Sequence, residues 1–110
     1  MALLFFKKAV PVSYSDNLEL AGYSGEKTYF AGDGCPLRRL HAFVTDPLTA
    51  GSITLTESKA GKTVTLSPTA PMASVEISSA LGPADKLTVS CVSSATLAPT
   101  TADVVAVVET

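Results

Sequence analysis

The sequence predicts an all-β protein, an antiparallel β-sandwich of about seven to eight strands. Two observations support this fold class. Apolar and polar residues alternate along most of the chain, as they do when successive side chains point to opposite faces of a strand. Turn signals recur about every 8–12 residues, which is the spacing of short strands in a sandwich. The pattern fits a jelly-roll or an immunoglobulin-like topology and does not decide between them.

The N-terminal third of the chain has the least regular pattern. Strands are expected over residues 2–6 and 10–14, and another strand is expected to open at Tyr29. The segment 15–21 is the one candidate for a short helical turn. Pro11 lies within the second of these two segments.

The central part of the chain contains the clearest strands. Residues 37–45 alternate in polarity, and residues 52–58 and 63–66 do the same. The short link 59–62 between the last two segments predicts a β-hairpin. Gly61 suits this turn because glycine adopts a positive φ without steric cost.

The C-terminal part continues the β pattern. Strands are expected over residues 74–78 and 86–93, followed by a final strand over 104–108 that is apolar on both faces. A strand has this composition when both of its faces are covered. The second cover is either the protein itself or another subunit.

The composition indicates one globular domain over residues 1–110. Charged residues make up 16% of the chain, against a typical ~25%, and the net charge is −2. This balance argues against a disordered tail and against a nucleic-acid binder, whose phosphate contacts need clustered Lys and Arg. No run of about 18 apolar residues occurs, so no membrane-spanning helix is expected.

The chain contains two cysteines, Cys35 and Cys91. They are too sparse for the disulfide framework of a small secreted domain. Cys91 falls on the expected inward face of its strand, where a buried free thiol is common. The sequence leaves open whether the two cysteines are bridged. No further Cys or His lies at metal-ligand spacing, so neither a metal nor a cofactor is expected.

No active-site signature is found. Residues 60–63 resemble the end of a phosphate-binding loop, but the upstream glycine is missing and a strand follows instead of a helix. Cys35 needs a nearby base to act as a nucleophile, and His41, the only histidine, lies on a strand that leads away. Arg38 and Arg39 are neighbours, so a regular strand points them to opposite faces and no basic patch is expected. We therefore expect a protein that is not an enzyme.

Both ends of the chain are strongly apolar, although chain ends are usually polar and frayed. The mean hydropathy is positive, and Ser and Thr occupy outward strand positions where Lys and Glu often protect sheet edges. We therefore expect surfaces that neighbouring subunits cover. The expected interface residues are apolar side chains from the two chain ends: Leu3, Leu4, Phe5, Phe6, Val105 and Val107.

Residues 1–8 have two possible roles. They form either a first strand that enters the core or an apolar arm that docks on a neighbouring subunit. The arm hypothesis predicts that a chain lacking residues 1–8 still folds but no longer assembles.

The stretch 51–109 contains the segments GSITLT and GKTVTL, followed by ADKLTVSCVSSATLAPTTADVVAVVE. It has a strand that starts at glycine, a glycine-containing hairpin and an Asp-Lys-Leu strand opening. A Pro-Thr-Thr-Ala-Asp loop then precedes a Val-rich final strand. This order resembles the last four strands of small β-sandwich domains in the virions of tailed bacteriophages. The resemblance implies a virion structural protein, often trimeric, on a capsid or tail surface.

The resemblance and the apolar chain ends together predict a non-enzymatic virion structural protein of the capsid decoration, cement or head-fibre type. Its expected partners are further copies of itself, with a trimer favoured, and the major capsid protein or another virion protein. It would be made in the host cytoplasm and incorporated into the virion. The alternative is a β-sandwich binding module that recognises glycan or protein on a cell surface through loop aromatics, with Tyr14 and Tyr23 as candidates.

Overall fold

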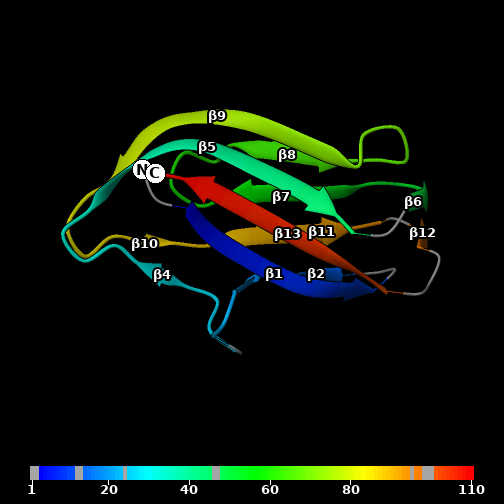
Figure 1. Cartoon of the computed structure of the whole chain (residues 1–110), viewed down its shortest axis with the longest axis horizontal. Coiled ribbons are helices and arrows are strands. Elements are labelled where there is room, and N and C mark those ends of the chain that lie inside the picture. Colours follow the sequence, from blue (N-terminus) through cyan, green and yellow to red (C-terminus); the bar gives the residue numbers. More distant parts are fainter. Residues whose placement is uncertain (1–2, 12–13, 24, 46–47, 95, 98–100) are drawn as a thin grey trace.

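The protein consists of two β-sheets that pack against each other around one core, as the computed structural model shows (Figure 1). The regular structure of the described residues is all β, and their strands pair antiparallel. The prediction of an all-β antiparallel sandwich is therefore confirmed. The structure describes residues 3–11, 14–23, 25–45, 48–94, 96–97 and 101–110.

The larger sheet forms the front layer in Figure 1. Its five strands lie in the order β3-β1-β13-β5-β9. Four of them are nine or ten residues long, whereas the edge strand β3 has two. In this order the bounds are Glu19–Leu20, Leu3–Pro11, Thr101–Glu109, Cys35–Val44 and Met72–Leu81.

The smaller sheet forms the rear layer, with four strands in the order β2-β11-β7-β8. Their bounds in this order are Tyr14–Asn17, Val89–Ser93, Ile53–Glu57 and Thr63–Leu66. Two short antiparallel pairs complete the described strands. These are β10 (Lys86–Leu87) with β4 (Tyr29–Phe30), and β12 (Thr96–Leu97) with β6 (Leu48–Ala50).

The order of the strands identifies the topology as a jelly roll. Among the described residues, eight strands have four or more residues. In chain order, one sheet places the first, eighth, third and sixth of these strands side by side. The other sheet places the second, seventh, fourth and fifth side by side. Two Greek keys wound together produce this order, so the immunoglobulin-like alternative does not apply.

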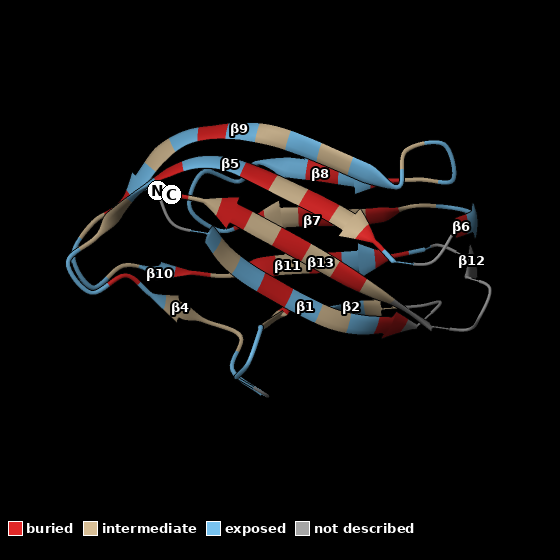
Figure 2. Ribbon diagram, in the orientation of Figure 1, coloured by how far each residue is buried: buried red, intermediate tan, exposed pale blue. Residues whose placement is uncertain are grey.

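The core lies between the two sheets because each strand turns alternate side chains inward (Figure 2). Among the described residues, Phe6 is the one aromatic side chain that is completely buried. Most of the other buried side chains are aliphatic. Burying each large aliphatic side chain stabilises the fold by roughly 1.5–3 kcal/mol. The largest aliphatic members are Leu18, Leu37, Leu40, Ile53, Leu55, Leu66 and Leu87.

The first strand is longer than the sequence pattern predicts. β1 pairs with β13 over its whole length, from Leu3 opposite Glu109 to Pro11 opposite Thr101. Residues 3–8 therefore form part of a strand in the body of the sheet, and the separate-arm alternative for residues 1–8 is not what the described residues show. Pro11 is the last residue of β1, and proline, which cannot donate a backbone hydrogen bond, disturbs strand pairing least at such a position.

The candidate helical turn over residues 15–21 is wrong. Tyr14–Asn17 forms β2 of the rear sheet, and Glu19–Leu20 forms β3 of the front sheet. Between them Leu18 is completely buried, and its N–H donates to the carbonyl of Val89 (2.8 Å). Tertiary pairing with two different sheets overrides the weak local preference of this segment.

A buried carboxylate organises the predicted hairpin between β7 and β8. Glu57 is completely buried, although charged side chains are almost never buried without partners. The backbone N–H groups of Lys59, Ala60 and Lys62 donate to its two oxygens over 2.7–3.0 Å. These bonds satisfy the carboxylate and hold the turn that contains Gly61, which has a φ of 73°.

Residues 31–35 form a tight structural turn before β5. Gly34 has a φ of 94°, and a Cβ at this position would lie 2.6 Å from the carbonyl oxygen of Leu81. Both the backbone conformation and the close approach therefore require glycine. The Gly34 N–H donates to the carbonyl of Ala31 (3.0 Å), which closes the turn.

Removal of residues 1–8 should unfold the protein, because it removes most of β1 and the buried Phe6.

A matched pair of variants separates core packing from the exposed side of the same strand. Phe6→Ala should lower the free energy of unfolding by about 3–5 kcal/mol, and Phe5→Ala should lower it by about 1 kcal/mol or less. Urea unfolding followed by circular dichroism measures both. A truncated chain with an unchanged unfolding midpoint would restore the arm hypothesis.

Replacement of Glu57 by glutamine should loosen the hairpin, because the amide NH₂ group then faces backbone N–H donors that have lost an acceptor. We expect Glu57→Gln to lower the free energy of unfolding by about 1–3 kcal/mol. The control Glu26→Gln, at an exposed loop position, should change it by about 0.5 kcal/mol or less. Equal effects of the two substitutions in thermal or urea unfolding would contradict the anchoring role.

Candidate functional site

The two outward faces of the sandwich differ in chemistry. The rear sheet presents hydroxyl side chains, with Thr54 opposite Thr65 and Thr56 opposite Thr63. The Oγ1 atoms of Thr56 and Thr63 lie 3.1 Å apart, within hydrogen-bonding distance. Among the described residues of this face, the one large apolar side chain that is exposed is Val92 on β11, at 53%. The rear face is thus mostly polar.

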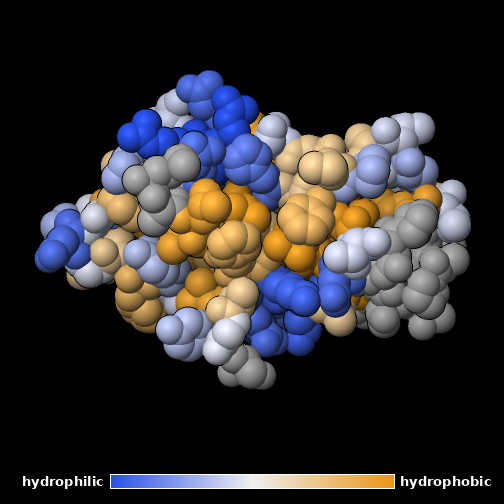
Figure 3. All heavy atoms as spheres, viewed as in Figure 1, coloured by the Kyte–Doolittle hydropathy of each residue, from blue (hydrophilic) through white to orange (hydrophobic). Residues whose placement is uncertain are grey.

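The front sheet presents apolar side chains on its outward face. Its register places Phe5 opposite Val107, Val105 opposite Phe43, and Phe43 opposite Met72. Figure 3 shows hydrophobic residues gathered across the middle of this side of the molecule. We call this surface the apolar face, and it consists of Leu3, Phe5, Phe43, Met72, Val105 and Val107.

The side chains of the apolar face are open to solvent to different degrees. Leu3 is 48% exposed, Phe5 46% and Met72 72%. Phe43 and the two valines of β13 are partly buried. Large exposed apolar patches on soluble domains commonly mark interaction sites. The face is therefore the strongest candidate for a contact surface.

The predicted interface residues divide between the two sides of the front sheet. Leu3 and Phe5 of β1 join Val105 and Val107 of β13 on the outward face. Phe6 lies completely in the protein's own core, so its assignment to an interface is wrong. Successive residues of a strand point to opposite sides, and the run of apolar residues in β1 obscured that alternation.

Leu4 lies on the inward side of β1 with Phe6. It packs against the core and is partly exposed.

The sequence pattern did not identify two members of the apolar face, Phe43 and Met72. The alternation over residues 37–45 already placed Phe43 on an outward side. Only the register of β5 between β13 and β9 places Phe43 beside Val105 and Met72 beside Phe43.

Charged residues of both signs border the apolar face. Lys7 Nζ lies 3.3 Å from Asp103 Oδ2 at one end. His41 Nε2 lies 3.2 Å from Glu109 Oε2 at the other end, next to Arg39. These pairs are partly exposed, so they add little to stability. They place charges of both signs beside the apolar side chains, and many protein interfaces have a polar rim of this kind around an apolar centre.

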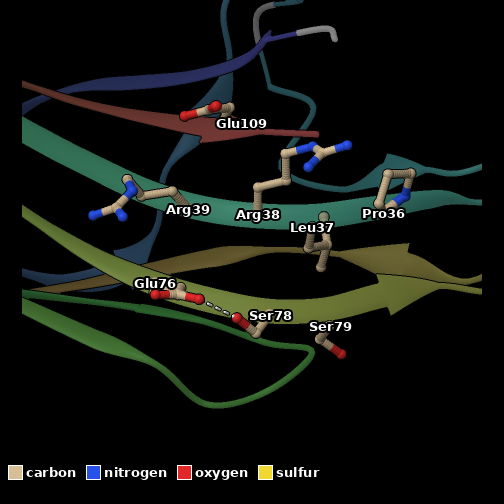
Figure 4. A pocket seen from close by; sticks show the side chains of 8 residues that line it. All are labelled: Pro36, Leu37, Arg38, Arg39, Glu76, Ser78, Ser79 and Glu109. Carbon is tan, nitrogen blue, oxygen red and sulfur yellow. Dashed lines mark hydrogen bonds between the residues drawn. The ribbon is translucent and has the colours of Figure 1, made fainter.

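The expectation that Arg38 and Arg39 point to opposite faces is wrong. Both arginines are exposed, whereas Leu37 and Leu40 on either side of them are buried. The β5–β9 register shifts between Leu37 and Arg39, and such an irregularity re-aims side chains. Both arginines consequently line one hollow of about 440 Å³, shown in Figure 4.

A second hollow of about 450 Å³ lies beside the N-terminal end of β1. Its wall is mainly apolar and includes Leu3, Phe5, Tyr23 and Phe30. Tyr23 is exposed in a loop, as the binding-module alternative expects, whereas Tyr14 is half-buried in β2. Of the two aromatic residues that the binding-module alternative names, only Tyr23 is therefore exposed in a loop.

The residues considered for nucleophilic chemistry do not form a catalytic group in the described structure. Cys35 begins β5, and His41 further along that strand pairs with Glu109 instead. Both cysteines are free thiols. Burial raises the pKa of the Cys91 thiol to about 12, so this group stays protonated at neutral pH.

The described residues contain no group of three or more His, Cys, Asp or Glu side chains placed to hold a metal ion. They also contain no helix with the length and apolar character needed to cross a bilayer.

No protein-family model, curated protein or solved structure matches this chain.

The two thiols should differ in reactivity. Cys35 is half-buried and should react slowly with Ellman's reagent at pH 8, while Cys91 should react only after unfolding, because its pKa of about 12 leaves almost no thiolate. The variant Cys35→Ser should therefore show no reactive thiol until denaturant is added. Rapid reaction of the folded variant would show that Cys91 is accessible.

Proposed function

We propose that this protein is a non-enzymatic structural subunit that associates with further copies of itself through the apolar face. The observation that supports this proposal most directly is the contrast between the two outward sheet faces. One face carries hydroxyl groups that water solvates well, and the other carries aromatic and aliphatic side chains from β1, β13, β5 and β9. Contiguous exposed apolar patches of this kind commonly mark protein contact surfaces.

The driving force for association is the removal of the apolar face from water. Each Å² of apolar surface that leaves water contributes roughly 25 cal/mol, and only the excess over the entropic cost of association becomes affinity. Aromatic side chains near the centre of an interface usually contribute most. Val105 and Val107 lie in the middle of the apolar face on β13, and Phe5 and Phe43 flank them on β1 and β5.

The charged rim makes a second copy of the chain a suitable partner. Each end of the apolar face carries both signs of charge, Lys7 with Asp103 at one end and Arg39 with Glu109 at the other. Symmetric packing can therefore oppose unlike charges at both ends. A partner of one strong charge would not be matched in this way.

We further propose that the assembly belongs to a virion, as a capsid decoration, cement or fibre protein. Two arguments support this step. Jelly rolls are common in viral capsid proteins, and the stretch 51–109 resembles β-sandwich domains of tailed-bacteriophage virions. The trimer, the major capsid protein or another virion protein as partner, and the virion location remain predictions from that resemblance.

Self-association can be tested with two matched substitutions on opposite sheets. Phe5→Glu introduces a charge into the apolar face, whereas Val92→Glu introduces the same charge on the rear face at a similarly exposed position. Sedimentation velocity at micromolar concentrations should show an oligomer for the unchanged protein. We expect Phe5→Glu to weaken association by about 2 kcal/mol or more, roughly 30-fold in dissociation constant, and Val92→Glu to leave it nearly unchanged.

Circular dichroism should show both variants folded, since both positions face outward. A monomeric unchanged protein throughout the micromolar range would contradict the proposal. So would equal weakening by the two substitutions, because the contact would then not be specific to the apolar face.

A further inference from the structure

We propose that the free edge of β9 pairs with the β9 edge of a second copy of this chain. The two strands run antiparallel about a twofold axis, so the two front sheets join into one continuous sheet. This contact uses backbone N–H and C=O groups at the side of the sandwich. It is distinct from the apolar face, which uses side chains on the outward surface, and it does not depend on association through that face.

The two edges of the front sheet differ in how far the protein covers them. At one edge β3 has two residues, and the following loop folds over it. Leu20 N–H donates to the carbonyl of Glu26 (2.7 Å), and Tyr23 N–H donates to the carbonyl of Leu20 (3.1 Å). At the other edge β9 has ten residues and is the outermost strand of the sheet (Figure 1). Within the described structure, the long uncovered edge of the front sheet is therefore β9.

Hydrogen bonds at the end of β5 show how this strand divides its backbone groups between its two neighbours. Val44 N–H donates to the carbonyl of Pro71, which precedes β9 (3.2 Å). The next residue, Thr45, donates its N–H to the carbonyl of Asp103 on β13 (3.0 Å). Successive residues therefore bond alternately to the β9 side and to the β13 side, as antiparallel pairing requires.

The same alternation identifies which backbone groups of β9 point away from β5. Residues 73 and 75 lie opposite residues 42 and 40, so their N–H and C=O groups bond to β5. Those of Met72, Ser74 and Glu76 consequently point to the uncovered side. All three residues are exposed, and among the described residues no backbone hydrogen bond from another segment reaches them. We call their outward backbone groups the open edge.

The open edge lacks most of the features that keep edge strands from pairing. Soluble proteins protect such edges with short strands, lysines, prolines or bulges. Residues 72–76 contain neither Lys nor Pro, and Glu76 is their one charged residue. Their register with β5 is regular, and the shift in pairing comes after Glu76, where Ser78 has a φ of 51°. A regular stretch of five residues is thus available to another strand.

The limits of this stretch favour a second copy of the chain as its partner. Pro71 lacks an N–H group, and regular pairing ends after Glu76, so the stretch is centred on Ser74. A twofold axis at Ser74 places Ser74 of one copy opposite Ser74 of the other, and Met72 opposite Glu76 in both directions. Every outward N–H group then meets an outward C=O group. The two Glu76 carboxylates are not opposite each other, an arrangement that would destabilise the pair.

Pairing about this axis produces a closed dimer. Both copies contribute the same edge, so no β9 edge is left for a third copy. The outward residues of paired strands stay on one side of the sheet. The apolar faces of the two copies would therefore lie side by side on one surface of the joined sheet.

Disulfide trapping tests the pairing directly. Directly opposed, hydrogen-bonded residues of antiparallel strands have Cα atoms about 5.5 Å apart, a separation that a disulfide spans. In a Cys35→Ser/Phe5→Glu background, Ser74→Cys should form a covalent dimer when it is oxidised with diamide. The control Ser15→Cys, at an exposed serine on the edge strand β2 of the rear sheet, should stay mostly monomeric on a non-reducing gel.

A backbone substitution separates edge pairing from side-chain contacts. Ser74→Pro removes the outward N–H group, and proline is tolerated on an edge strand where that group faces away from the sheet. Sedimentation velocity of the Phe5→Glu protein at high micromolar concentration should show a weak monomer–dimer equilibrium. Adding Ser74→Pro should weaken it about tenfold or more, whereas adding Ser74→Ala should change it less than about twofold. Circular dichroism checks that both variants are folded.

Three results would overturn the β9 pairing: no covalent dimer of the Ser74→Cys protein, equal trapping at positions 74 and 15, or equal effects of Ser74→Pro and Ser74→Ala. If Ser74→Pro fails to fold, the trapping experiment decides. The effect of Phe5→Glu on the unchanged protein concerns the apolar face alone. Failure of one contact is therefore distinguishable from failure of the other.

Discussion

The pairing of the first strand with the last is the interaction on which the rest of the structure depends. β1 and β13 pair from Leu3 with Glu109 to Pro11 with Thr101. This ladder joins residues from the two ends of the chain, so the loop that it closes contains nearly all of the protein. Such a pairing has a high entropic cost, and the buried Phe6, Val10, Val104 and Val108 on its inward side offset it.

The same ladder produces the apolar face. Because the strand period is two, every side chain that β1 and β13 place in the core has a neighbour on the outward side. The outward neighbours include Leu3 and Phe5 on one strand and Val105 and Val107 on the other, together with the charged Lys7, Asp103 and Glu109. Apolar residues on both sides of these strands thus supply the core on one side and the proposed contact surface on the other. One pair of strands contributes to both.

Two polar features mark places where local chemistry departs from the regular pattern. Glu57 is buried, but backbone N–H groups satisfy its carboxylate, and the result is a firm turn without a free charge. Arg38 and Arg39 are both exposed because the β5–β9 register shifts between Leu37 and Arg39. Arg39 lies opposite Glu109 on β13 and opposite Glu76 on β9.

The sequence by itself determined the fold class and most central strands, because alternation over residues 37–45, 52–58 and 63–66 reflects a local backbone geometry. It also identified the apolar chain ends. Only the tertiary structure decided which of those residues face outward together, since register depends on partners distant in the chain. It likewise decided the jelly-roll order and the common side of the two arginines, because strand order and an irregular ladder arise from pairing, and no local pattern specifies a pairing.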